Sequence, residues 1–284
     1  MSKTKSRKVV NNPLPRCEGP KLHAFECKNT SIAWGRRLDE DRGDSSTTQS
    51  AVFEVTIESR VYALKVFKFY DPYSDAYYWG PLLRDDIPLE EILCYTDPFF
   101  AECRAYGRIH EARDKSGSKE TLAIECHGYL YLSKDDETFL TELGVDLGID
   151  ILDDSLRKAL GRGGRVRAIV KDMAPETSGV ATRSLTKVLR KVRALNQLDI
   201  FNRDIRLENF RGGLLVDFGS SWTKPHIVLD ALGAVDKRDS LLEDLVMFDD
   251  MIAEENIKTR LKALPNLEYR EKLRPRTDRT KRTS

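Results

Sequence analysis

Residues 202–219 read NRDIRLENFRGGLLVDFG, and this stretch decides how the rest of the chain is interpreted. It brings Asp204, Asn209 and Asp217 into a short span, with the apolar run Leu214 to Val216 directly before the last of them. That run is too short for a helix and follows two glycines, so it predicts a buried strand that presents Asp217 at its end. Gly219 then allows the chain to turn away.

The residue types in this stretch suit the transfer of a phosphoryl group. Such a reaction needs a carboxylate near the incoming hydroxyl, and oxygen ligands for the metal ion that holds the nucleotide phosphates. Asp204 supplies the first group, and Asn209 and Asp217 supply the second. Arg-Asp and Asp-Phe-Gly are each common enough to arise by chance, since an Asp after a strand is often a turn former. Their order and spacing together favour the chemical interpretation.

The stretch resembles the catalytic loop and the metal-binding loop of the protein-kinase-like superfamily. The resemblance implies that Asp204 is the catalytic base and that Asn209 and Asp217 bind Mg²⁺. Arg206 stands where protein kinases usually carry a lysine near the transferred phosphate. Asn202 replaces the usual histidine, and this change is expected to affect the position of the loop more than the chemistry.

Upstream, two apolar runs predict a β-hairpin. Residues 52–57 (VFEVTI) alternate apolar and polar side chains, and a second run, VYALKVFKF, starts at Val61 and contains Lys65. The resemblance implies that Lys65 contacts the nucleotide phosphates and pairs with a glutamate on the following helix. The alternative is a solvent-facing lysine on an edge strand.

The glutamate partner is predicted to be Glu102. Asp97 and Pro98 form a typical helix start, with Asp as N-cap and Pro at the first helical position, and the next residues continue with helical spacing. Two alternatives stay open, namely Glu111 near the helix end and an ordinary surface role for Glu102.

Two parts of a protein-kinase-like nucleotide site are less well defined in this sequence: the glycine-rich loop over the phosphates and the hinge beside the adenine ring. Before Val52 the chain reads GDSSTTQSA, with Gly43 as the single glycine where protein kinases have a glycine-rich loop over the phosphates. A polar connector is the alternative for this segment. Residues 165–173 predict a strand that runs into a hinge, where backbone groups from Val170 to Met173 would bind an adenine ring, and an ordinary core strand is the equal alternative.

The residues after the predicted hinge indicate a small, mainly helical C-terminal lobe. A stripe of leucines and valines over residues 185–198 recurs at helical spacing and predicts an amphipathic helix with a core-facing side, and residues 240–256 predict a second, buried helix. Asp244 in that helix either matches the buried aspartate that supports the catalytic loop in the superfamily, or is a surface acid. No Ala-Pro-Glu element follows Gly219, which argues against ordinary docking of a peptide substrate.

Composition bounds the fold class. The 284 residues are 40% apolar, which suits one α+β domain: a two-lobed, protein-kinase-like fold with a small β-rich N-lobe (about 22–170) and a reduced helical C-lobe (about 171–257). The flanking residues 1–21 and 258–284 are basic tails, interpreted as solubilising disorder or, alternatively, as a weak nucleic-acid contact. Segments 70–97, with the aromatic residues Tyr73, Tyr77, Tyr78 and Trp79, and 133–164 read as insertions.

Several function classes are disfavoured. No apolar run approaches the length of a membrane span, and the first residues are not typical of a signal peptide. The five cysteines form no close pair in the sequence, which suggests reduced thiols in cytosol or nucleus and no zinc site.

Three motifs taken together, ALKVFKFYDP from Ala63, DPFFAECRAYGR from Asp97 and NRDIRLEN from Asn202, are more particular than the superfamily. They resemble a fungal family of small kinase-like proteins grouped with a subunit of the inner-kinetochore Sim complex. The resemblance covers about residues 22–257 and implies a nuclear protein with kinetochore or chromatin partners. Two hypotheses follow: an atypical phosphotransferase that uses ATP and Mg²⁺, or a non-catalytic scaffold subunit with the same fold.

Overall fold

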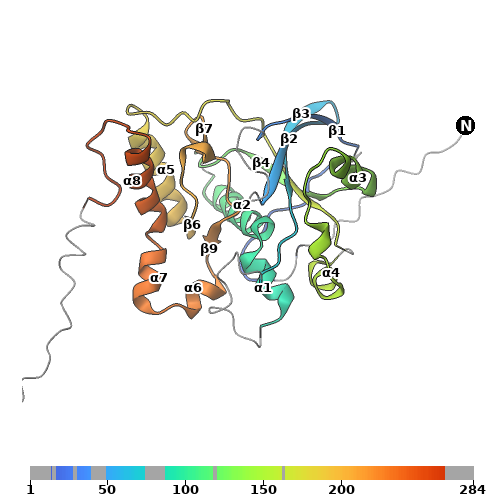
Figure 1. Ribbon diagram of the computed structural model, residues 1–284. Coiled ribbons are helices and arrows are strands. Elements are labelled where there is room, and N and C mark those ends of the chain that lie inside the picture. Colours follow the sequence, from blue (N-terminus) through green and yellow to red (C-terminus); the bar gives the residue numbers. More distant parts are fainter. Residues whose placement is uncertain are drawn as a thin grey trace, which may run out of the picture.

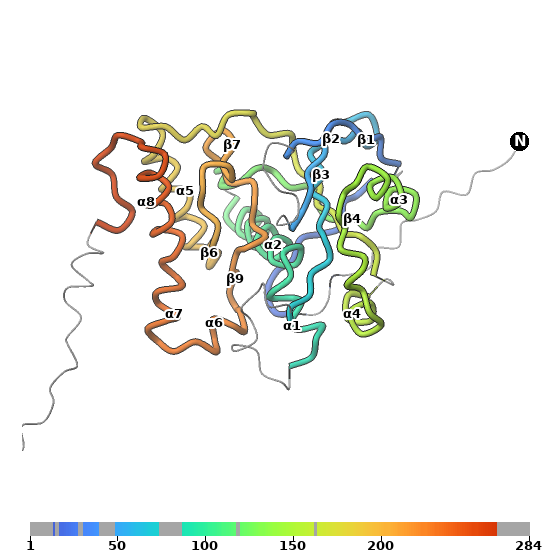
Figure 2. The backbone as a smooth tube through the Cα atoms, viewed as in Figure 1, coloured from blue at the N-terminus to red at the C-terminus, as the bar shows by residue number. Residues whose placement is uncertain are grey.

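The computed structural model describes residues 14, 17–27, 31–39, 49–73, 87–117, 120–161 and 164–265. These residues form a mixed α/β structure with one antiparallel sheet of five strands (Figure 1). In both Figure 1 and Figure 2, the sheet, α3 and α4 lie on one side, α5 to α8 lie on the other, and α2 lies between the two groups. In this coarse form, the expected combination of α-helices with an antiparallel sheet is confirmed.

The sheet has the strand order β1-β2-β3-β5-β4 with every neighbouring pair antiparallel, and its strands are β1 (Ala33–Arg37), β2 (Ser50–Ile57), β3 (Arg60–Phe67), β4 (Cys126–Tyr131) and β5 (Arg167–Lys171). The predicted hairpin is β2 and β3. Its turn residues Glu58 and Ser59 both have positive φ, at 49° and 66°, as a tight two-residue hairpin requires. Side chains of β2 alternate between buried and half-buried, as its sequence predicts.

Two helices connect β3 to β4, and they are α1 (Leu89–Thr96) and α2 (Pro98–Ser116). The predicted helix start is confirmed, because the Asp97 carboxylate accepts a hydrogen bond from the Phe99 amide at 2.8 Å and Pro98 is the first helical residue. The helix ends at Gly117, whose left-handed conformation (φ 62°) suits a residue without Cβ.

The segment interpreted as an insertion, residues 133–164, is folded into the protein where the structure describes it. It forms α3 (Lys134–Glu142), the short 3₁₀ helix η4 (Ile149–Ile151) and α4 (Asp154–Leu160). Leu140, Leu156 and Leu160 join the main core cluster. The segment is therefore part of the core. Of the predicted aromatic cluster, Tyr73 is exposed, and Tyr77, Tyr78 and Trp79 lie outside the described residues.

The C-terminal half is built from short strands and helices: α5 (Leu185–Gln197), β6 (Ile200–Asn202), η5 (Leu207–Asn209), β7 (Phe210–Arg211), β8 (Leu214–Leu215), β9 (Ser221–Thr223), α6 (Ile227–Ala231), α7 (Ala234–Ser240) and α8 (Glu243–Glu254). The apolar stripe of α5 is buried as predicted, from Leu185 to Leu195. The strand predicted before Asp217 is present as β8, paired with β7. Among the described helices, none has the length and apolar character needed to cross a membrane.

Candidate functional site

The sheet presents three cationic side chains to helix α2. Lys65 of β3 lies opposite Ile169 of β5, and Arg167 and Lys171 flank Ile169 at strand spacing on the same face. All three are at most 5% exposed as whole residues. Because isolated buried charges are very unfavourable, this face requires acidic partners from the elements packed on it.

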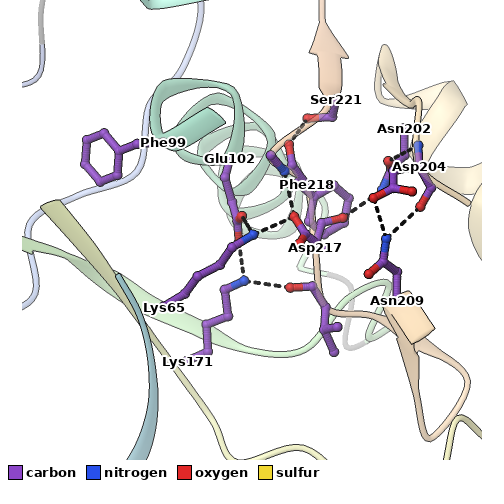
Figure 3. Close-up of polar contacts among 12 residues, drawn as sticks. Lys65, Phe99, Glu102, Lys171, Asn202, Asp204, Asn209, Asp217, Phe218 and Ser221 are labelled. Atoms are coloured by element: carbon purple, nitrogen blue, oxygen red, sulfur yellow. Dashed lines mark hydrogen bonds and ion pairs between the residues drawn. The ribbon is translucent and has the colours of Figure 1, made fainter. Parts of the chain in front are cut away.

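Glu102 of α2 bridges two of these cations (Figure 3). Its Oε2 lies 2.8 Å from Lys65 Nζ, and its Oε1 accepts a hydrogen bond from Lys171 Nζ. Glu102 has no exposed surface, whereas Glu111 pairs with Lys115 on the outside of the helix. The predicted Lys65–Glu102 pair is therefore confirmed, and the two alternatives for the pairing are excluded.

Asp217 contacts Lys65 directly, and the backbone carbonyl of the residue before it contacts Lys171. Its Oδ1 lies 2.5 Å from Lys65 Nζ and accepts the Gly219 amide at 2.8 Å, while Lys171 Nζ donates to the Val216 carbonyl at 2.6 Å. Burial alone would raise the pKa of Asp217, but the positive charges of Lys65 and Lys171 outweigh it and hold that pKa well below its usual range. Burial lowers the pKa of Lys65, and the charges of Asp217 and Glu102 more than reverse this, so Lys65 stays protonated.

Asn202 connects the two loops of the motif. Its Nδ2 donates to the Asp217 carbonyl at 2.7 Å, and its Oδ1 accepts the Asp204 amide at 3.0 Å. The amide side chain thus joins the backbone on both sides of the site with one donor and one acceptor. Asn202 therefore holds the loop of Asp204 to the loop of Asp217, whereas the expected effect of the missing histidine on loop position stays a prediction.

Asp204 is held beside the cleft by Asn209 and Arg206. Asn209 Nδ2 donates to Asp204 Oδ2 at 2.8 Å, and Arg206 Nε lies 3.1 Å from Oδ1, although the Arg206 side chain is 59% exposed. Burial raises the pKa of Asp204, Arg206 lowers it, and the nearby negative charge of Asp217 raises it; the net pKa lies above the usual value. A carboxylate with a raised pKa is a stronger proton acceptor.

The oxygen of the Asn209 side chain fits a metal ligand. Asn209 is fully buried, its nitrogen is used by Asp204, and its Oδ1 has no hydrogen-bond partner. An unsatisfied buried oxygen is costly unless a ligand completes it. The described residues contain no cluster of three His, Cys, Asp or Glu side chains with metal-binding geometry. One carboxylate and one amide still suit Mg²⁺, which keeps several ligands from water and phosphate.

A cavity of about 600 Å³ lies between the sheet and the Asp217 loop. It is bordered by Arg36, Val52, Lys65, Asp172, Met173 and Asp217, among others. Val170 does not border it and is a fully buried core residue of β5, whereas Met173 lies on its edge. Gly43 lies outside the described residues.

A second cavity, of about 880 Å³, shares Lys65 and Asp217 with the first. It opens beside Asp204 and Arg206, and the α8 residues Met251 and Glu254 border it. Lys65, Asp217 and Asp39 border both cavities, so a molecule in either one would lie beside the same three charged side chains.

Asp244 of α8 is buried, at 2% exposure, which excludes the surface alternative. Burial raises its pKa to about 7, although hydrogen bonds from Asn196 and from the backbone amides of Leu245 and Asn202 act in the opposite direction. Asn196 Nδ2 lies 3.3 Å from Asp244 Oδ1. Asp244 thus lies beneath the loop that begins at Asn202.

The sequence interpretation missed Lys171. It ends an apolar strand and reads as the point where the strand leaves the core. The available signal was its spacing of four residues from Arg167, which on a strand places both side chains on one face. Only the packing of α2 shows that this face is covered by acidic residues.

Comparison with known protein families identifies a relationship over most of the chain. The family model described as Kinetochore Sim4 complex subunit FTA2 matches residues 10–222, well over half of the 284 residues. The matched range includes Lys65, Glu102, Asp204, Asn209 and Asp217. A search of curated proteins found no significant match.

Proposed function

The chain belongs to the family of kinetochore Sim4 complex subunit FTA2, and from this membership we propose that it is a nuclear subunit of a kinetochore complex, built on a protein-kinase-like fold whose cleft binds ATP with Mg²⁺. The family membership supports the kinetochore part of the proposal. The arrangement of Lys65, Glu102 and Asp217 supports the nucleotide part.

The kinetochore role predicts a location on chromatin. When the chain is tagged in its native cells, centromeric DNA is expected to be enriched over chromosome-arm DNA in cross-linked precipitates. The Asp217→Ala variant should be enriched equally if the protein acts there as a scaffold, because Asp217 lies in the cleft. Absence of centromeric enrichment for the unaltered chain would remove the kinetochore role from the proposal.

Support for a kinase-like fold comes from the context of the motifs. In protein kinases the phosphate-binding lysine lies on the third strand and pairs with a glutamate of the following helix, and the metal-binding Asp follows a short strand. Here Lys65 lies on β3, Glu102 on α2, and Asp217 two residues after β8. These three residues, far apart in the sequence, meet at Lys65 Nζ. That meeting point is the observation that carries the proposal.

A nucleotide would use the charges already present. Lys65 would contact its phosphates, Asp217 and the unsatisfied Oδ1 of Asn209 would hold Mg²⁺, and the edge of the cavity near Met173 would take the adenine ring. The metal ion would neutralise charge on the phosphates and orient them. Glu102 and Lys171 would keep Lys65 and the Asp217 loop in place.

Calorimetry with Mg²⁺ and ATP tests the nucleotide site. The unaltered protein is expected to bind ATP in a metal-dependent way, and Asp217→Ala should weaken binding by at least tenfold, or about 1.4 kcal/mol. Asp114→Ala, which removes an exposed carboxylate from the same protein, is the matched control and should bind normally. If neither the unaltered protein nor the control binds ATP, the nucleotide part of the proposal fails and the scaffold role alone stands.

Phosphotransfer to a hydroxyl is a second candidate function, favoured by Asp204. Its carboxylate lies beside the cavity that adjoins the proposed nucleotide site, and its raised pKa suits a general base. Asp204 would orient an acceptor hydroxyl and take its proton, and Arg206 would face the transferred phosphate.

A further inference from the structure

Residues 257–264, which follow α8, run along helix α5. The Thr182 hydroxyl, just before α5, donates to the Lys258 carbonyl at 3.2 Å, and Arg193 Nη2, in the second half of α5, donates to the Ala263 carbonyl at 3.1 Å. Because these contacts occur in the same order in both stretches, the segment lies beside the helix and runs in the same direction. Figure 2 shows it in red, at the end of the molecule where α5 begins.

Helix α8 and the core hold this segment in place. The two carboxylate oxygens of Asp249 accept the amides of Ala263 and Leu264, at 2.7 and 3.0 Å. Ala263 is 2% exposed and belongs to the main core cluster, against which Ile257 and Leu261 also pack. The cations between these apolar side chains are exposed, and they are Lys258, Arg260 and Lys262. The segment thus buries apolar side chains and presents its charges to solvent.

Helix α5 adds a second row of cations beside the first. Its apolar stripe is buried, and Lys187, Arg190 and Arg193 are exposed at steps of three residues, which places them on one face of the helix. Neither α5 nor residues 257–264 contain an Asp or Glu. We call these six exposed side chains the basic face: Lys187, Arg190, Arg193, Lys258, Arg260 and Lys262.

Nearby carboxylates compensate little of this positive charge. Among the ion pairs between described residues, one involves the basic face, and it joins Arg190 Nη2 to Glu120 Oε1 at 3.3 Å. The two side chains are 66% and 47% exposed, and such surface pairs contribute little. Burial lowers the pKa of the neighbouring Lys191, and the positive charge of Lys187 lowers it further. A surface of this kind attracts polyanions.

The residue types on the basic face indicate which polyanion fits. No large apolar side chain is exposed on α5 or on residues 257–264. Helices that bind membrane surfaces insert large apolar side chains, protein interfaces have aromatic and methionine centres with few lysines, and single-stranded nucleic acids stack their bases on aromatic rings. The phosphate backbone of a duplex needs only cations and hydrogen-bond donors. The basic face supplies these groups alone.

The length of the two rows suits a duplex backbone. Lys187 and Arg193 are about 9 Å apart along the helix axis, and Lys258 and Lys262 are at most about 14 Å apart in an extended chain. One strand of duplex DNA carries a phosphate every 3.4 Å or so along its axis. Each row of three cations therefore matches about three or four consecutive phosphates.

We propose that the basic face binds the phosphate backbone of double-stranded DNA without reading its base sequence. The choice of DNA as the polyanion rests on the proposed function, which places the chain on chromatin. Among the described residues, no member of the basic face borders either cavity of the candidate site. DNA and nucleotide would therefore bind to separate parts of the protein.

Fluorescence anisotropy with the full chain and a labelled duplex of about 20 base pairs tests the proposal. If all six cations contact phosphates, the affinity should fall about 10³-fold between 50 and 200 mM salt. The variant Lys258→Gln/Arg260→Gln/Lys262→Gln should bind at least tenfold more weakly. The slope of log affinity against log salt should fall by about two to three, because each lost phosphate contact contributes about 0.9.

The matched control removes the same charge elsewhere. Lys115→Gln/Lys158→Gln/Arg238→Gln alters one exposed cation on each of α2, α4 and α7, and its affinity and salt slope should stay within about twofold of the unaltered protein. Equal losses in the control and in the first variant would show that DNA binding follows net charge, and would overturn the proposal.

A second variant does not depend on the packing of residues 257–264. Lys187→Gln/Arg190→Gln alters α5 alone and should lower the salt slope by about two. Lys258→Arg/Lys262→Arg keeps both charges and should bind as the unaltered protein does. DNA binding that is unchanged in both glutamine variants, or no binding by the unaltered protein, would overturn the proposal.

Competition separates DNA from other polyanions. Unlabelled duplex DNA is expected to displace the labelled duplex at a lower concentration than duplex RNA or polyglutamate of equal charge. Displacement at lower concentration by either competitor would assign the basic face to that polyanion and overturn the choice of DNA. These measurements use purified protein, so their failure is distinct from an absence of centromeric enrichment in cells.

Discussion

Replacement of Arg167 by methionine is expected to destabilise the protein by about 3–5 kcal/mol, because it leaves a buried carboxylate without its cation. Arg167 Nη1 lies 2.6 Å from Asp97 Oδ2, and the two side chains are 1% and 0% exposed. The guanidinium also contacts the faces of Phe69, Phe99 and Phe100 at 5.1 to 5.6 Å. Methionine fills much of this apolar space but supplies no charge.

The measurement is urea unfolding followed by circular dichroism. In thermal unfolding of the same variant, the expected loss of stability corresponds to a fall in melting temperature on the order of 10 °C for a protein of this size. Lys237→Met is the matched control, since Lys237 pairs with Asp230 on the surface and its loss should change stability by less than about 0.5 kcal/mol. A loss for Arg167→Met as small as that of the control would show that the buried pair does not stabilise the fold.

A double variant separates charge from packing. Asp97→Asn keeps an oxygen to accept the Phe99 amide as the helix cap but removes the negative charge. Combined with Arg167→Met, it should be more stable than Arg167→Met alone, because no unpaired charge is left in the core. Simple additivity of the two single losses would contradict this explanation.

Replacement of Asp204 by asparagine is expected to lower phosphotransfer by about 10²- to 10⁴-fold, the usual contribution of a general base. Asparagine keeps an oxygen to accept the hydrogen bond from Asn209 but cannot take a proton. The assay is transfer of labelled γ-phosphate from ATP to the chain itself or to an added protein, at saturating Mg²⁺. Equal rates for the unaltered protein and Asp204→Asn would exclude Asp204 as the base.

The pH profile gives this prediction a second readout. The base works only when deprotonated, so the rate should fall as pH falls through the raised pKa of Asp204. Because the positive charge of Arg206 lowers that pKa, Arg206→Met should move the acidic limb to higher pH. Metal-dependent ATP binding without any transfer would leave the nucleotide-binding scaffold and remove the catalytic proposal.

Lys171 connects the buried ion pairs of the core to the Asp217 loop of the candidate site. It lies on the same face of β5 as Arg167 and binds Glu102 as Arg167 binds Asp97, so two buried ionic contacts hold the start of helix α2 and its first turns to β5. The Lys65–Glu102 pair adds a third buried contact, from β3. Lys171 also donates to the Val216 carbonyl, which holds the Asp217 loop to the same unit. The parts of the proposed nucleotide site are thus connected to one another by the residues that stabilise the core.

Local patterns predicted much of the fold. Alternation of side chains predicted β2, the Asp97–Pro98 pair predicted the start of α2, and the apolar stripe predicted the buried face of α5. Each of these depends on residues close in the sequence, where backbone geometry fixes which side chains share a face. The same local reasoning did not find that residues 133–164 are part of the core, because acidic residues and glycines interrupt its apolar residues, so no single period runs through the segment.

The sequence by itself determined which polar residues are available to the proposed site, since the identity and order of Asp204, Asn209, Asp217, Lys65 and Glu102 limit what such a site can bind. Tertiary structure alone decided which partners these charged side chains contact and how deeply each one is buried. Lys171 lies in the site, Asn202 connects its two loops, and Val170 lies in the core. The physical reason is that burial and charge pairing depend on what packs against a side chain, and those partners come from distant parts of the chain.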